Sequence, residues 1–178
     1  MNDKQRKGIC FPWEHPLRNA IDNNWHITKS AVGDMEDDQV DLCKQIFNGL
    51  HSDEYRDVVY KQVKEDSPGG FEDSAIAIFG EPGTGKFEFV LTGRHVTRRC
   101  DGDSLEGSAF GGPIFYGHAA DGFNEKSGHK GNAYWFQAKR PNELFQALDG
   151  KQRKVALLDK RSRGERGNKT IETKGTVK

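Results

Sequence analysis

Three histidines and one glutamate are placed where they could carry chemistry: His95, His118, Glu125 and His129. His95 follows a predicted strand, His118 follows a second one, and the other two lie four residues apart in the polar segment beyond it. Imidazole and carboxylate groups are ligands for zinc, iron or manganese, and loops at strand ends can bring such groups together. The set is compatible with a small metal or polar site; the sequence does not identify a cofactor, and a divalent transition metal is one candidate.

A second interpretation of the same residues needs no ligand. A glycine directly precedes each of the three histidines, which would allow tight turns around a small site, but the spacing matches no named metal motif. His95 and His118 would then hydrogen bond to buried backbone groups, while His129 would be solvated. The sequence leaves both interpretations open.

Three arginines lie close to the first histidine: Arg94, Arg98 and Arg99. A guanidinium binds carboxylates and other anions through two parallel hydrogen bonds, so the cluster could clamp an anion. In the enzymatic interpretation His95, His118 and Arg94 are the catalytic residues. The alternative is a surface network with Asp101 and Asp103. A strand that continued over Thr92–Arg99 would place Arg94 and Arg98 on one face and His95 on the other.

The stretch GEPGTGK, Gly80–Lys86, has the form of a phosphate-binding loop. Such a loop needs Ser or Thr after its lysine to bind Mg²⁺, and here Phe87 occupies that position. The lysine should also open a helix, whereas KFEFVLT has the alternation of a strand. We therefore expect a β-hairpin loop here, and no binding of ATP or GTP.

Composition restricts the class of protein. The 178 residues have no net charge, but residues 1–150 carry 17 Lys and Arg against 24 Asp and Glu, so an acidic body precedes a basic end. The three cysteines form no CxxC pair, which is typical of a reducing compartment. No apolar run approaches the ~18 residues of a membrane span, and no signal peptide is apparent. These features predict a soluble, cytoplasmic protein.

Periodicity predicts an α+β fold, with a helical hairpin and C-terminal helices packed on a small, mainly antiparallel sheet. We expect an irregular N-terminal arm over residues 1–33, a single α+β domain over 34–159 and a disordered basic tail over 160–178. The expected helices cover 37–50, 52–65 with Ser52 as N-cap, 133–148 and 149–158; the expected strands cover 74–79, 87–91 and 114–116.

The order of several motifs resembles the bacterial family grouped as domain of unknown function 3500. The similar stretches are Gly93–His95, Pro113–Gly117 and Leu148–Gln152, and the resemblance extends over roughly residues 25–158. The usual Gly-His-His is Gly-Arg-His here, and the chain resembles a shortened version without the N-terminal part. The resemblance supports the fold and the placement of the motifs and leaves the chemistry open.

Two classes of function are compatible with these observations. The first is an enzyme with a small His/Glu metal or polar site. The alternative is a non-catalytic binding or assembly module that uses its basic tail or surface to bind a protein partner or a second copy of the chain. The acidic body argues against nucleic acid, and the absence of a long apolar run argues against a membrane.

Overall fold

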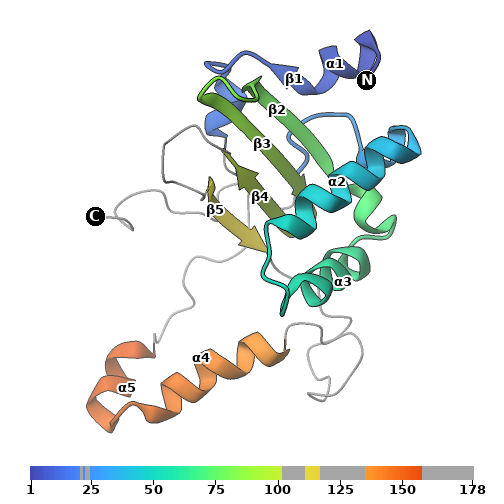
Figure 1. Ribbon diagram of the computed structural model, residues 1–178. Helices are drawn as coiled ribbons and strands as arrows, with labels where there is room; N and C mark the ends of the chain where they lie inside the picture. Colours follow the sequence, from blue (N-terminus) through green and yellow to red (C-terminus); the bar gives the residue numbers. More distant parts are fainter. Residues whose placement is uncertain (21, 23–24, 102–110, 117–134, 158–178) are drawn as a thin grey trace. The chain divides into compact units, whose positions relative to one another are not determined.

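The computed structural model describes residues 1–20, 22, 25–101, 111–116 and 135–157 (Figure 1). Its regular elements are α1 (Asp3–Ile9), β1 (Cys10–Phe11), α2 (Asp37–Gly49), α3 (Arg56–Asp66), β2 (Ala75–Glu81), β3 (Lys86–Gly93), β4 (Val96–Cys100), β5 (Gly111–Tyr116), α4 (Trp135–Ala147) and α5 (Gly150–Ala156), with short 3-10 helices at Pro16–Asn19, Val32–Asp34 and Gly70–Asp73. The tail predicted for residues 160–178 lies outside the described residues.

The chain divides into two compact units, Met1–Ala119 and Ala120–Lys178. This boundary falls inside the single domain predicted for residues 34–159. The reason for the difference is that hydrophobic periodicity marks helices and strands but does not say which of them share a core.

The first unit is built on a sheet whose described strands have the order β1-β2-β3-β4-β5. β1 runs parallel to β2, and the other neighbouring pairs are antiparallel. The predicted hairpin is confirmed, since Ala75 lies opposite Thr92 and Glu81 lies opposite Lys86. Together with the helices, this mainly antiparallel sheet confirms the α+β class.

The helices α2 and α3 cover one face of the sheet (Figure 1). Their buried residues recur at helical spacing, Cys43 and Phe47 in α2 and Val59 and Val63 in α3. The sheet supplies alternate residues of its central strands to the same core: Ile76, Phe89, Leu91 and Val96. This packing holds the helical hairpin against β2, β3 and β4.

The boundaries of α2 agree with the sequence prediction, but α3 begins later. The helix was predicted to begin after Ser52 as its N-cap. In the structure the N-cap is Tyr55 and the first helical residue is Arg56. The Ser52 carbonyl accepts the N–H groups of Tyr55 and Arg56 at 3.0 and 2.9 Å, which forms a turn before the helix. A serine followed by two acidic residues is compatible with either a turn or the N-cap of a helix. In this chain Ser52 forms a turn, and the helix begins after it.

The N-terminal segment covers the opposite face of the sheet. Residues 1–33 were predicted as irregular, but they contain α1 and β1. Asn2 and Gln5 cap α1 reciprocally, each side chain accepting the other's backbone N–H at 2.9 and 2.8 Å. From Phe11 onward, aromatic and aliphatic side chains of the segment pack on Ala77, Phe79 and Val90; these are Phe11, Trp13, Leu17, Trp25 and Ile27.

A buried ionic network joins this segment to the sheet. The side chains of Arg99 and Glu88 are 4% and 8% exposed, and Arg99 Nη1 lies 2.6 Å from Glu88 Oε1. Arg99 also donates to the backbone carbonyls of Arg18, at 2.8 Å, and Ala20. Arg18 contacts the second Glu88 oxygen at 3.3 Å and stacks over Trp13 at 4.0 Å. One guanidinium of β4 therefore fixes the path of the N-terminal segment.

The GEPGTGK stretch forms the loop between β2 and β3. Lys86 opens a strand, whereas a phosphate loop would place a helix there. The loop depends on glycine: Gly80, Gly83 and Gly85 have φ values of 69°, 78° and 75°. At Gly80 a Cβ atom would also clash with the carbonyl oxygen of Lys86. The absence of nucleotide binding stays a prediction.

The second unit contributes α4 and α5. Pro141 lies inside α4, which continues through it. Asp149 caps α5 as predicted, its carboxylate accepting the N–H groups of Lys151 and Gln152 at 2.8 and 2.9 Å. The predicted packing of these two helices on the sheet stays a prediction. In the described parts of the chain, no helix combines the length and the apolar character that crossing a membrane requires.

Replacing Arg99 by methionine should lower the free energy of unfolding by about 3 kcal/mol, because Glu88 would stay buried without its closest partner. Lys61→Met is the control, since Lys61 and Glu65 form a solvent-exposed pair at 3.8 Å. Its effect should stay below about 0.5 kcal/mol. Urea unfolding measures both variants, and equal losses would contradict the role assigned to Arg99.

Gly80→Ala should cost about 2 kcal/mol or more, because the positive φ is strained for alanine and the new methyl group clashes with the Lys86 backbone. Gly83→Ala has the same kind of strain with no atom within 4 Å of the added Cβ. It should cost only about 1 kcal/mol. Thermal or urea unfolding compares the two; a larger loss for Gly83→Ala would contradict this account of the hairpin loop.

Candidate functional site

The structure describes one of the four predicted metal ligands. His95 lies in the turn between β3 and β4, whereas His118, Glu125 and His129 belong to residues 117–134, which are outside the described part of the chain. Among the described residues, no group of three or more His, Cys, Asp or Glu side chains is arranged to hold a metal ion. The predicted ligand set therefore stays a prediction.

His95 lies in a turn, in agreement with its expected place after the second strand of the hairpin, so no strand continues over Thr92–Arg99. Gly93 pairs with Val96, so Arg94 and His95 form a two-residue turn between antiparallel strands. A Cβ at Gly93 would lie 2.9 Å from Val96 Cγ1 and 3.3 Å from Ser74 Oγ, so the close approach requires glycine. Strand-like residues on both sides conceal the turn, because Arg and His are not typical turn residues.

The arginines do not form the single cluster that was predicted. The turn projects Arg94 away from the sheet as an exposed residue. Arg98 and Arg99 are only 2% and 6% exposed and lie on opposite faces of β4, because consecutive strand residues alternate. The three residues therefore do not form a common anion clamp, and the network with Asp101 and Asp103 stays a prediction because Asp103 lies outside the described residues.

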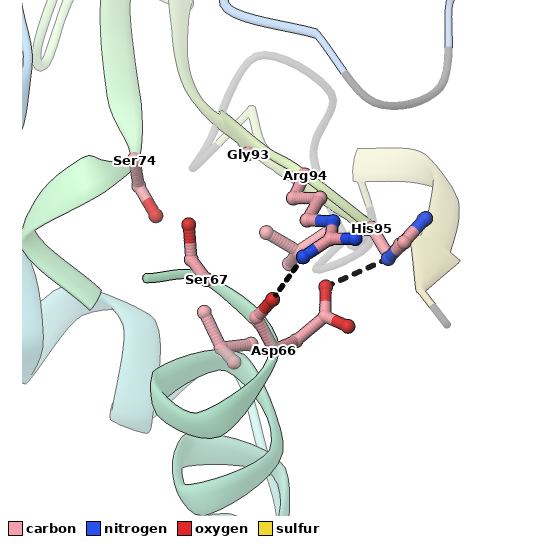
Figure 2. Close-up of a pocket in the computed structure, with 8 residues that line it drawn as sticks. Asp66, Ser67, Ser74, Gly93, Arg94 and His95 are labelled. Atoms are coloured by element: carbon pink, nitrogen blue, oxygen red, sulfur yellow. Dashed lines mark hydrogen bonds and ion pairs between the residues drawn. The ribbon is translucent and has the colours of Figure 1, made fainter. Parts of the chain in front are cut away.

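Asp66, the last residue of α3, holds both residues of the turn (Figure 2). Its carboxylate lies 2.7 Å from Nδ1 of His95, and its backbone carbonyl accepts a hydrogen bond from Arg94 Nη1 at 3.0 Å. The Asp66 side chain is 4% exposed, while that of His95 is 26% exposed. The last carbonyl groups of a helix have no partners within the helix and carry a partial negative charge. An arginine and a histidine can therefore both donate hydrogen bonds at the end of α3.

The contact with Asp66 determines which imidazole nitrogen is available. A carboxylate accepts hydrogen bonds, so Nδ1 of His95 carries the proton and donates it. The neutral ring then presents the lone pair of Nε2, which Figure 2 shows on the side away from Asp66. Asp66 is therefore buried behind a partly exposed imidazole whose second nitrogen points away from it.

A small pocket lies beside this pair. Its cavity volume is about 10 Å³, room for about one water molecule, and its remaining lining comes from Val63, Ser67, Ser74, Gly93 and Val96. In Figure 2 the hydroxyls of Ser67 and Ser74 lie on one side of the Arg94 guanidinium and the imidazole on the other. Ser67 donates to Asp73 at 2.7 Å, a hydrogen bond that lowers the pKa of the Asp73 carboxyl. Neither serine is placed as a nucleophile activated by His95.

The sheet register brings a second segment toward His95. Val96 lies opposite Tyr116, the last residue of β5, so the turn reaches the end of that strand. This confirms the expectation that the hairpin carries His95 to the end of the strand predicted at 114–116. His118 follows two residues later in the chain and is not among the described residues.

Sequence reasoning missed Asp66. The residue ends a helix directly before the breaker SPGG, where a carboxylate is unfavourable beside the helix dipole unless a cation or a donor compensates it. That conflict was a usable signal of a partner. Nothing local indicates His95 as that partner, because 29 residues separate the two.

In comparisons with protein-family models, curated proteins and solved structures, no match to this chain was found. The resemblance to domain of unknown function 3500 therefore stays a prediction. The site is interpreted from its own geometry.

Asp66→Asn should change the imidazole tautomer of His95, because an amide can donate to Nδ1 where the carboxylate can only accept. It should also lower the free energy of unfolding by about 1–3 kcal/mol through the loss of a charge-assisted hydrogen bond. Long-range ¹H–¹⁵N NMR reports the tautomer and urea unfolding the stability. Asp53→Asn, with a side chain 92% exposed, is the matched control. An unchanged Nδ1-protonated ring in Asp66→Asn would contradict the assignment.

Proposed function

We propose that the chain is an enzyme whose chemistry is proton transfer at Nε2 of His95. The observation that carries this proposal is the 2.7 Å contact between His95 Nδ1 and the buried carboxylate of Asp66. Such a carboxylate holds the imidazole in one tautomer and one orientation and stabilises the imidazolium that forms when Nε2 takes a proton. His95 is the general base or acid, and Asp66 is the residue that positions it.

Arg94 completes the proposed site. Its Nη1 is held by the Asp66 carbonyl, which restricts the orientation of the guanidinium next to the imidazole. In the described part of the chain its other donors make no hydrogen bond, and the residue is exposed. They can therefore bind a polar group of a substrate while His95 exchanges a proton with a neighbouring atom.

A divalent transition metal at the same nitrogen is a second candidate, supported by the register that brings the end of β5 to His95. Histidines that bind metals usually donate their other ring N–H to a carboxylate, as His95 does. In this version the further ligands would be those that the sequence predicts, His118, Glu125 and His129, and a metal there would supply Lewis-acid activation of a substrate oxygen or water.

The test compares His95→Gln with the exposed His26→Gln on activated carboxylic and phosphoric esters. Loss of a positioned general base should slow hydrolysis about 100-fold in His95→Gln, because base catalysis contributes at least that much. His26→Gln should match the native protein. Acylation by diethyl pyrocarbonate gives a measurement independent of the substrate: His95 should react faster in the native protein than in Asp66→Asn.

Elemental analysis of the same purified proteins distinguishes the two candidates. Stoichiometric metal that His95→Gln loses supports the metal centre. Metal-free protein with His95-dependent hydrolysis supports simple acid–base chemistry. Hydrolysis and acylation that do not depend on His95 and Asp66 would exclude both candidates and favour the binding or assembly module, especially if another protein or a second copy co-purifies.

A further inference from the structure

A second histidine makes a contact of the opposite kind on the helical face of the sheet. His51 lies in the connection between α2 and α3, and its Nε2 is 2.9 Å from Nε of Arg98 in β4. Its Nδ1 is 2.7 Å from the carbonyl oxygen of Phe47, in the last turn of α2. The ring packs on Phe47 at 4.7 Å, and Arg98 is 2% exposed. One imidazole thus joins the end of α2 to the sheet.

The protonation state of this imidazole follows from its partners. An arginine Nε–H can only donate, so Nε2 of His51 must accept with its lone pair. The proton is therefore on Nδ1, where it is donated to the Phe47 carbonyl. A second proton, on Nε2, would place two N–H groups against each other and two positive charges in a half-buried position.

Two arginines among the described residues oppose that second proton on His51. Arg98 approaches from β4 and Arg56 from α3, and Arg56 is itself paired with Asp53 in the connection. Burial first, and then these two arginines, lower the pKa of His51, and the hydrogen bond to the Phe47 carbonyl offsets this only in part. From α2 the ring contacts that carbonyl and the Phe47 ring.

We propose that His51 is an acid-sensitive latch: protonation of Nε2 breaks its hydrogen bond to Arg98 and releases the α2–α3 connection from the sheet. The inference rests on this contact alone and is independent of the proposed function. The released state exposes the buried Arg98 to water, which compensates the guanidinium for the acceptor that it loses.

The pH range of the latch follows from proton linkage. An opened or unfolded state binds the proton with the ordinary histidine pKa of about 6.5, and the closed state binds it with a lower one. The open state therefore holds more protons as the pH falls. The contact is fully stabilising above about pH 6.5 and is lost progressively below it.

Hydrogen exchange of the intact chain at pH 7.5 and pH 5.0, corrected for intrinsic rates, tests the latch. Amides near the end of α2 and the start of α3 should lose protection several-fold at pH 5.0 in the native protein. In His51→Gln, which cannot titrate, their protection should not depend on pH. His26→Gln, the exposed histidine control, should behave like the native protein. Equal pH dependence in His51→Gln would overturn the proposal.

A measurement on the native protein keeps the proposal testable if His51→Gln does not fold. ¹⁵N NMR of the His51 ring should show a proton on Nδ1 and a lone pair on Nε2 at pH 7.5. The pH midpoint of its protonation should lie below that of a histidine in the unfolded chain. A midpoint at or above about 6.5 would overturn the latch, because the closed state would then not exclude the proton.

Discussion

Two consecutive arginines are buried in β4, and each must find partners in the layer that covers its face of the sheet. An unpaired guanidinium in a protein interior costs several kcal/mol. Each layer must therefore lie where it supplies hydrogen-bond acceptors to the arginine that faces it. Arg98 donates to His51 and to the Thr97 carbonyl on the helical side. Arg99 donates to Glu88 and to two carbonyls of the N-terminal segment on the other. One dipeptide therefore attaches both outer layers to the sheet.

The packing of these two layers on the sheet also fixes the geometry of the candidate site. Asp66 ends α3, which is held by Val59 and Val63 in the core, and His95 lies in a turn whose strands are buried on both faces. The contact between them thus joins two elements that the core already positions. A catalytic pair on rigid elements loses little entropy when a substrate binds, which is the advantage of preorganisation.

His51 and His95 show how a partner decides what one residue type can do. The Nδ1–H of each ring is donated to an oxygen, a backbone carbonyl for His51 and a carboxylate for His95. The difference is at Nε2, where Arg98 occupies the lone pair of His51, whereas the lone pair of His95 faces outward. We propose that the first ring is a structural acceptor that acid can disturb and that the second carries out proton transfer.

Local patterns in the sequence were sufficient for α2, the β2–β3 hairpin and the capping of α5 by Asp149, because these depend on residues within a few positions of one another. They failed where a short signal had two outcomes, as at Ser52, where a turn formed and the helix began later. The pairs Asp66–His95 and His51–Arg98 span 29 and 47 residues. Only the packing of the helical layer on the sheet decided them, because periodicity reports which face of an element is buried and not which residue lies across from it.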